Sequence, residues 1–354
     1  MIGWPQWIKK VVVEGTGRDP LGLSRMSDWL TDSLLPGVIT TTDRARYYSY
    51  YPWAIADIER ERGRGDRSVD FDAEFQRREA AFALASALEH VTDLPIVGVR
   101  RINVLIAGED NEGRLQTLSR VLPSNPTGGF GQYYSGCLQL LGLVTVDENG
   151  EWVVASDVGK ELVAAFEETC KSALYLMDGW RKHDRVPMDV LRKSAASFSL
   201  DAIGEDFAAN ERNLLIDLFV ERGTKPSGTS PHYRQATIGL FLHVLTQYEE
   251  SGSTVNRRDV DRDAIFWPHY FGALANDDGT LIPYEPAAPL AGCRMYWEQW
   301  CAHQFVVIAL EILFEGVLQD LAKNPEGMTK GELLDALVTS DFESDLKRLT
   351  HFLQ

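Results

Sequence analysis

Arginine and aromatic side chains are concentrated in the stretch RARYYSYYPW, from Arg44 to Trp53. The planar guanidinium group of arginine can make bidentate contacts with phosphate or carboxylate groups, and it can stack on aromatic rings. On a helix, side chains three or four positions apart are neighbours, so Arg44 would lie beside Tyr47 and Arg46 beside Tyr50. Such a strip could stack bases and hold a nucleic acid backbone. The stretch therefore predicts a contact surface formed by Arg44, Arg46, Tyr47, Tyr50 and Trp53.

The same stretch also fits an aromatic core. Its four tyrosines fall within five consecutive positions, which cover several faces of a helix and cannot all point at one ligand. A tyrosine ring is readily buried when its hydroxyl group has a hydrogen-bond partner, and the arginines could pair with nearby acids. Between Thr41 and Arg78 the chain holds eight arginines, no lysine and eight acidic residues, so the charges balance locally. At the level of sequence both interpretations stay open.

Arg262 and His269 offer a second kind of chemistry. Six residues separate them, a spacing that fits some helical ribonucleases, in which the arginine stabilises charge and the histidine moves a proton during attack by a 2′-hydroxyl group. The pattern is short enough to occur by chance. Pro268 directly precedes the histidine and would disturb the helix that such enzymes need. Arg262 and His269 are therefore weak catalytic candidates.

The chain carries no local motif of a hydrolase, a metal-dependent nuclease or a cysteine enzyme. A Gly-x-Ser-x-Gly elbow is absent, and the acids near Asp70 and Glu74 lack the lysine of a nuclease motif. The four cysteines form no C-x-x-C pair, so we expect buried thiols, no metal site and no cofactor. These absences favour a nonenzymatic protein. A nuclease site assembled from distant residues is the alternative, because such a site leaves no local motif.

Composition and charge narrow the class of protein. The chain has 354 residues, of which 44% are hydrophobic and 25% charged, as in globular proteins with several domains. Its formal net charge of -17 repels polyanions on average, which disfavours nucleic acid as a partner. The first ten residues lack the apolar run of a signal peptide, which predicts a cytoplasmic protein. The apolar run from Phe305 to Leu318 is interrupted by Glu311 and Glu315 and is too short to cross a bilayer, so we expect a buried helix and no membrane contact.

The clearest structural pattern lies between residues 112 and 170. The Asn149-Gly150 pair, flanked by alternating apolar residues, predicts a β-hairpin. The order of helix, glycine turn, helix, hairpin and helix is that of a winged helix-turn-helix, and LQLLGLVTVDENGEWVVASDVGKELVAAF resembles winged-helix domains. Apolar stripes at helical period fill the regions beyond it. We therefore predict a mainly α, multidomain helical protein with an embedded winged helix-turn-helix and few short strands, divided into residues 1–108, 109–180 (the winged helix) and 181–354.

The charge of this predicted winged helix argues against DNA binding. Winged helices usually place their second helix in the major groove and hold phosphates with arginine and lysine. The corresponding stretch from Phe130 to Leu141 contains neither residue type. From Glu109 to Cys170, ten acidic residues stand against three basic ones. A role in protein contacts or a purely structural role is therefore favoured.

The stretch DPLGLSRMSDWLTDSLLPGVITTTDRARYYSYYPW, from Asp19 to Trp53, resembles the opening of a family of uncharacterised bacterial proteins. In that family a D-x-L-G helix leads to an L-x-P-G turn and then to an arginine, aromatic and Pro-Trp segment. The resemblance covers about one tenth of the chain and implies a setting near restriction or antiphage genes, with no established catalytic residues. We expect a nonenzymatic component of a bacterial defence complex that binds a protein partner through the winged helix and the Arg44 to Trp53 segment.

Overall fold

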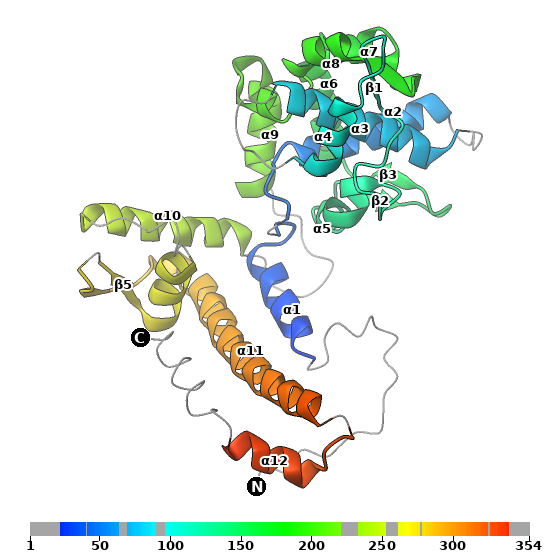
Figure 1. The fold of residues 1–354 in the computed structure, drawn as a ribbon. Helices are drawn as coiled ribbons and strands as arrows, with labels where there is room; N and C mark the ends of the chain where they lie inside the picture. Colours follow the sequence, from blue (N-terminus) through cyan, green and yellow to red (C-terminus); the bar gives the residue numbers. More distant parts are fainter. Residues whose placement is uncertain are drawn as a thin grey trace. The chain divides into compact units, whose positions relative to one another are not determined.

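Helices dominate the computed structural model of this chain, which has few short strands, as the sequence predicts (Figure 1). The structure describes residues 22–39, 41–63, 69–89, 96–220, 233–252, 261–276, 278–324 and 326–339. The start of the family-like stretch, Asp19 to Leu21, lies outside these ranges.

The chain divides into two compact units. One combines Met1–Leu34 with Gly239–Gln354, and the other is Leu35–Ile238. The boundaries predicted at 108/109 and 180/181 both fall inside the second unit. These boundaries do not separate compact units, because the three predicted segments share one core. A single cluster of buried apolar side chains runs from Tyr47 to Leu218 and joins them.

The unit Leu35–Ile238 is built around α2, which packs along α6, and α3, which packs along α8. Its elements in chain order are α2 (Tyr47–Arg62), α3 (Phe71–Glu89), α4 (Val99–Ala107), β1 (Arg114–Gln116), the π-helix η1 (Phe130–Tyr134), α5 (Ser135–Leu140), β2 (Val144–Val146), β3 (Trp152–Val154), α6 (Asp157–Cys170), α7 (Leu174–Met177), η2 (Trp180–Lys182), β4 (Arg185–Pro187), α8 (Met188–Ala195), η3 (Asp201–Gly204), η4 (Asp206–Ala208), α9 (Ala209–Val220) and the start of α10 (Arg234–Glu250).

Local sequence signals account for the ends of several of these helices. The Asp70 carboxylate accepts hydrogen bonds from the backbone N–H groups of Asp72 and Ala73 at the start of α3. Ser156 caps α6 in the same way, its hydroxyl oxygen accepting from the N–H of Gly159 at 3.1 Å. α2 ends at Arg62, and the next residue, Gly63, has a φ of 64° in the left-handed region that favours glycine.

Within the described ranges the strands pair as three antiparallel two-stranded ladders, β1 with β4, β2 with β3 and β5 with β6. The predicted hairpin is confirmed, because Val144 pairs with Val154 and Val146 with Trp152. In its turn Gly150 adopts a φ of 80°, in the left-handed region that favours glycine, whereas Asn149 keeps a negative φ. The turn is tightened by Asp147, whose carboxylate accepts from the backbone N–H of Asn149.

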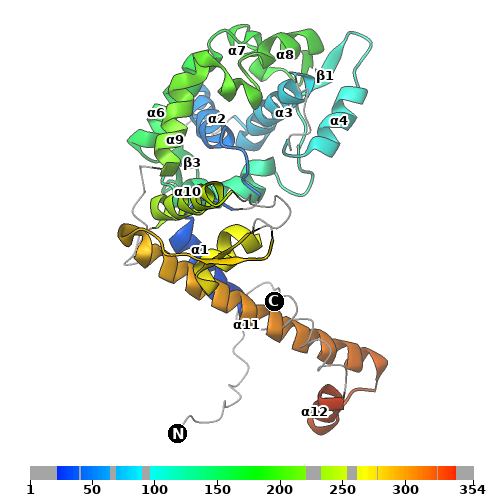
Figure 2. The same ribbon diagram turned by 90° about the vertical axis from the view of Figure 1, so that its left-hand side faces the viewer.

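The other unit is organised around one long helix, α11, with α1 alongside it (Figure 2). Its described elements are α1 (Ser24–Leu34), the remainder of α10, the π-helix η5 (Asp261–Phe271), β5 (Ala273–Ala275), β6 (Leu281–Pro283), η6 (Ala288–Leu290), α11 (Ala291–Lys323) and α12 (Lys330–Thr339). His303 and Gln304 of α11 form hydrogen bonds with Leu23 and with Ser27 of α1.

The predicted helix from Phe305 to Leu318 forms as part of α11, but it is not buried. In this 33-residue helix the buried side chains are Cys293, Trp297 and Cys301, all in its first third. Each lies four positions from the next, so one stripe faces the unit's core and the helix then extends beyond that core. No helix within the described ranges has the length and apolar composition needed to span a membrane.

Candidate functional site

The stretch from Arg44 to Trp53 forms an aromatic core. Tyr47, Tyr50 and Trp53 are each at most 1% exposed. The ring of Tyr50 stacks on that of Phe82 with centroids 4.0 Å apart. Tyr47 stacks on Tyr51 at 5.1 Å. These side chains cannot reach a partner, so the predicted contact surface is wrong for Tyr47, Tyr50 and Trp53, and the aromatic-core interpretation is confirmed.

Arg46 belongs to the same core. Its side chain is 1% exposed and forms an ion pair with the fully buried Glu211, with Nε 3.2 Å from Oε1. The guanidinium group also donates hydrogen bonds to the backbone carbonyl oxygens of Ser197, at 2.9 Å, and Ser199. Its carbon lies 5.1 Å from the centroid of the Phe166 ring. All these partners lie within the chain, so Arg46 is a core residue and not the predicted ligand contact.

Arg44 is the fifth residue of the predicted contact surface and the only one of the five that is half-buried. Its Nε is buried without a hydrogen-bond partner. A single half-buried guanidinium group does not form the predicted contact surface. The aromatic rings that were predicted to lie beside it are buried in the core instead.

A second buried arginine, Arg78, holds three carboxylates together. Its Nη2 lies 2.8 Å from Asp57 and 2.9 Å from Glu61, and its Nη1 lies 2.7 Å from Glu74. Arg181 also pairs with Asp57. Buried charges are tolerated when they are paired and hydrogen-bonded. The grouping of acids around one cation is therefore explained by internal neutralisation, and none of these carboxylates is left for acid–base chemistry.

Glu79 is a buried carboxyl group that sequence patterns did not single out. Its Oε1 accepts hydrogen bonds from the Tyr51 hydroxyl group, at 2.9 Å, and from the Gly129 N–H, at 2.8 Å. Burial raises the pKa of Glu79 to about 7, although these hydrogen bonds oppose the rise. Gly128 must lack a side chain, because a Cβ atom there would lie 1.7 Å from Oε2 of Glu79. Glu79 thus caps the backbone before η1 and has no access to solvent.

The predicted catalytic pair Arg262 and His269 is not assembled. Arg262 is 54% exposed and pairs with Asp263, whereas His269 is fully buried. Both lie on η5, a π-helix, whose i→i+5 hydrogen bonds give more residues per turn than the 3.6 of an α-helix. Residues seven apart are therefore not aligned on one face. Pro268 lacks the amide hydrogen that an α-helix needs, which agrees with the expected disturbance.

His269 is surrounded by other rings. Its centroid lies 6.1 Å from that of Trp297 and 5.9 Å from that of Tyr284. Burial and, to a lesser extent, the charge of Arg294 lower the pKa of His269 to about 4. Neither ring nitrogen has a hydrogen-bond partner. His269 is thus a neutral core side chain at pH 7.

Replacing His269 with phenylalanine is expected to stabilise the protein by about 1 kcal/mol at pH 7, because it removes an unsatisfied buried polar group. The unfolded chain binds a proton near pH 6.5 and the folded chain only near pH 4. Stability therefore falls as pH falls through this window, and His269→Phe should flatten that fall. Urea unfolding at pH 7 and pH 5 measures both effects. As a control, His243→Phe should destabilise, because Nδ1 of His243 lies 3.2 Å from the Tyr284 hydroxyl group.

A loss of stability in His269→Phe, together with loss of an RNA-cleaving activity of the wild-type chain, would contradict the assignment of His269 to the core.

The stretch from Phe130 to Leu141, which corresponds to the second helix of a winged helix, uses one face for the core. Across η1 and α5, Phe130, Tyr134 and Leu138 are buried. The exposed positions of the same stretch include Gln132 and Gln139, which carry no charge. This face therefore offers amide groups and no cation for phosphate.

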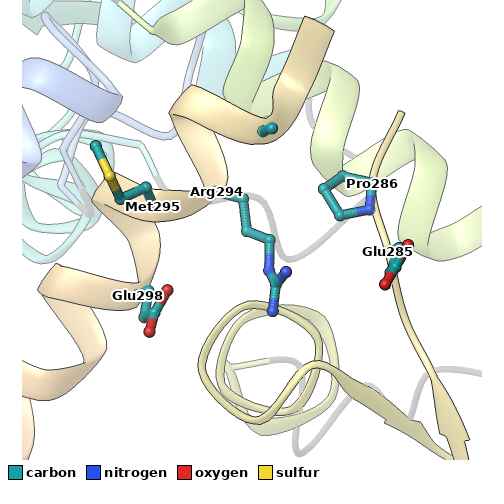
Figure 3. A pocket seen from close by; sticks show the side chains of 6 residues that line it. Glu285, Pro286, Arg294, Met295 and Glu298 are labelled. Atoms are coloured by element: carbon teal, nitrogen blue, oxygen red, sulfur yellow. The ribbon is translucent and has the colours of Figure 1, made fainter. Parts of the chain in front are cut away.

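A small pocket lies at the start of α11, where the Arg294 side chain extends from the helix (Figure 3). It encloses about 250 Å³ and is also lined by Glu298 of the same helix and by Glu285 from the segment after β6. Both glutamates are exposed. The lining residues contain no serine, cysteine or histidine, so Glu285 and Glu298 are the groups of this pocket that could act as a nucleophile or a proton carrier.

The second half of α11 presents an uncovered apolar face, which the sequence had assigned to a core. Val306 is 52% exposed, Leu310 is 37% exposed and Leu321 is 37% exposed. Leu313 and Val317, at intermediate positions on the same side, are half-buried. Exposed apolar side chains are ordinary when scattered, but a contiguous stripe marks an interaction surface. The sequence feature that could have shown that this helix is not fully buried is the pair Glu311 and Glu315, because two carboxylates on an otherwise apolar helix keep one side of it in water.

Metal chemistry finds no support in the part of the chain that the structure describes, where no three His, Cys, Asp or Glu side chains gather as a metal ion would need. The four cysteines are buried, as predicted. Burial raises the pKa of the Cys170 and Cys301 thiols to about 12, so both are protonated at neutral pH.

Comparison with protein-family models, curated proteins and solved structures found no match to this chain. The uncovered face of α11 is therefore the candidate functional site on physical grounds alone.

Proposed function

We propose that this chain is a nonenzymatic subunit of a bacterial protein complex and that it binds its partner through the apolar face of α11. The observation that carries the proposal is the exposure of Val306, Leu310 and Leu321 on one side of this helix. An apolar stripe left in water costs free energy that a partner would recover by covering it.

The proposal includes a winged helix at residues 109–180 as a second contact module. The order of η1 and α5, the β2–β3 hairpin and α6 supports this assignment. The absence of Arg and Lys from Phe130 to Leu141 favours a protein as its ligand. A role in antiphage defence rests on the resemblance of residues 19–53 to the bacterial family described above. A cytoplasmic location belongs to the same proposal.

A nucleic-acid-processing enzyme is the weaker alternative. It would need a catalytic group with access to substrate, and His269, its best local candidate, is fully buried. Arg262 is accessible but is already paired with Asp263. The geometry therefore favours the complex over the nuclease.

Affinity purification from the native host tests the proposal, comparing the wild-type chain with Val306→Asp. A carboxylate placed within a buried apolar contact is expected to cost about 2–4 kcal/mol of binding, enough to lose the partner during washing. The matched control is Ile216→Asp on α9, because Ile216 is 53% exposed and Val306 is 52% exposed. Surface substitutions of this kind leave folding stability within about 0.5 kcal/mol, which thermal unfolding checks.

A further inference from the structure

The pocket at the start of α11 is lined by charged groups that no ion pair of the described residues neutralises. The guanidinium group of Arg294 takes part in no hydrogen bond or ion pair among these residues, and its Nε is buried without an acceptor. Glu285 and Glu298 also line the pocket outside any such ion pair. By contrast, Arg46 and Arg78 each have a carboxylate oxygen within 3.2 Å. A bound ligand with a negative group would supply the acceptor that Arg294 lacks.

The fold holds the guanidinium group of Arg294 in place. In the view of Figure 3, Arg294 extends from α11 between Glu298, on the same helix, and the segment of Glu285 and Pro286. Its Nη2 lies against Gly272, directly after η5, where a Cβ atom would lie only 3.0 Å from that nitrogen. A planar guanidinium group held in this way presents paired N–H donors that match the two oxygens of a carboxylate.

The signs of the charges select the ligand. Arg294 attracts a simple anion such as phosphate, but Glu285 and Glu298 repel it. One guanidinium group against two carboxylates gives the lining a net charge of -1, which a ligand with one carboxylate and two ammonium groups would neutralise. The volume of about 250 Å³ suits a small ligand, and Ala291 and Met295 offer apolar surface for its methylene groups.

We infer that this pocket binds a free cationic amino acid, with its carboxylate on Arg294 and its ammonium groups facing Glu285 and Glu298. Recognition is noncovalent and combines charge-assisted hydrogen bonds at the guanidinium group with attraction to the two carboxylates. The inference goes beyond the proposed function and does not depend on it, because the pocket lies at the start of α11 and the exposed apolar face begins at Val306.

Calorimetric titration of the full chain with L-lysine tests the class of ligand. We expect a Kd on the order of 1 mM or below, as befits a ligand of this size. Two matched compounds separate the contributions, because 1,5-diaminopentane lacks the carboxylate and L-norleucine lacks the second ammonium group. Each should bind at least about tenfold more weakly than lysine. Equal binding of either compound, or no binding of lysine at about 20 mM, would overturn the inference.

Substitutions then locate the bound lysine. Arg294→Met removes the one cation among the lining residues and should raise the Kd of lysine at least about tenfold. Arg185→Met is the matched control, because Arg185 is 46% exposed and pairs with Asp110 in the other unit, and it should leave the Kd unchanged. Glu298→Gln changes an exposed side chain and should raise the Kd about threefold.

Thermal unfolding shows whether each variant is folded. If Arg294→Met does not fold, Glu298→Gln decides the test, since its exposed position does not contribute to the core. A wild-type Kd for lysine in a folded Arg294→Met chain, or in Glu298→Gln, would overturn the inference.

Discussion

Replacing Arg46 with methionine is expected to lower the free energy of unfolding by about 3–5 kcal/mol, because the change leaves the Glu211 carboxylate buried without its cation. Glu211 is fully buried and would retain only the Ser49 hydroxyl group as a close donor, at 2.6 Å. The carbonyl oxygen of Ser199 would also lose its Arg46 donor, and that of Ser197 would keep only the Cys170 thiol, at 3.1 Å. Urea unfolding followed by tryptophan fluorescence measures the change, since Trp53 lies in the same core.

Two further variants show whether the loss comes from the buried charge. Arg46→Met combined with Glu211→Leu removes both charges and should recover much of the stability. Arg60→Met is the matched exposed case, because Arg60 is 55% exposed and pairs with Glu167, and it should cost at most about 1 kcal/mol. If Arg46→Met folds as stably as the wild type but loses a bound partner, the contact surface predicted from the sequence is restored.

The second large effect is a pH dependence of stability that originates at Glu79. Its ordinary pKa of 4.5 is raised to about 7 by burial in the folded chain. The folded chain thus holds a proton that the unfolded chain has lost, so stability falls as pH rises from about 4.5 to about 7 and stays reduced above it. The loss is about 3 kcal/mol at 1.36 kcal/mol for each pKa unit.

Glu79→Gln is expected to abolish this part of the pH dependence. Its amide oxygen can accept from Tyr51 and Gly129 as Oε1 does, and its NH₂ group takes the place of the protonated Oε2. Unfolding measured at pH 5 and pH 8 should therefore differ less for the variant than for the wild type. Glu59→Gln serves as a control, because burial and Asp147 raise the pKa of Glu59 at a half-buried site. An unchanged pH dependence in Glu79→Gln would show that Glu79 is ionised in the core.

The elements that the sequence predicted are those with local causes. The hairpin at Asn149 and Gly150 forms because a positive φ is available at glycine and apolar residues alternate on both sides. α6 begins directly after Ser156, whose hydroxyl group accepts a hydrogen bond from the backbone N–H of Gly159 that the helix itself leaves without an acceptor. The apolar run after Phe305 is helical, again as its composition indicates.

The features that the sequence did not predict depend on contacts between residues far apart in the chain. Arg46 could be read as a ligand contact because nothing near it in sequence reveals Glu211, which is 165 positions away. Glu79 has an ordinary helical sequence around it, and only Tyr51 and Gly129 make it a buried cap. The two units also combine distant segments, since Met1–Leu34 joins Gly239–Gln354.

The same reasoning explains the error on α11. Apolar composition predicts that a helix is buried, but it does not distinguish burial against the chain's own core from burial against a partner protein. The core of this unit covers Cys293, Trp297 and Cys301 and leaves Val306 in water. The distribution of exposure along one helix is therefore what separates a core segment from an interaction surface.

The central claim, that a partner protein covers the apolar face of α11, is tested most directly by the molar ratio of copurifying protein to this chain in purifications from the native host. We expect a stoichiometric partner with the wild type and with Ile216→Asp, and its loss with Val306→Asp. An equal ratio for Val306→Asp and Ile216→Asp would contradict the claim and show that this face of α11 does not hold the partner.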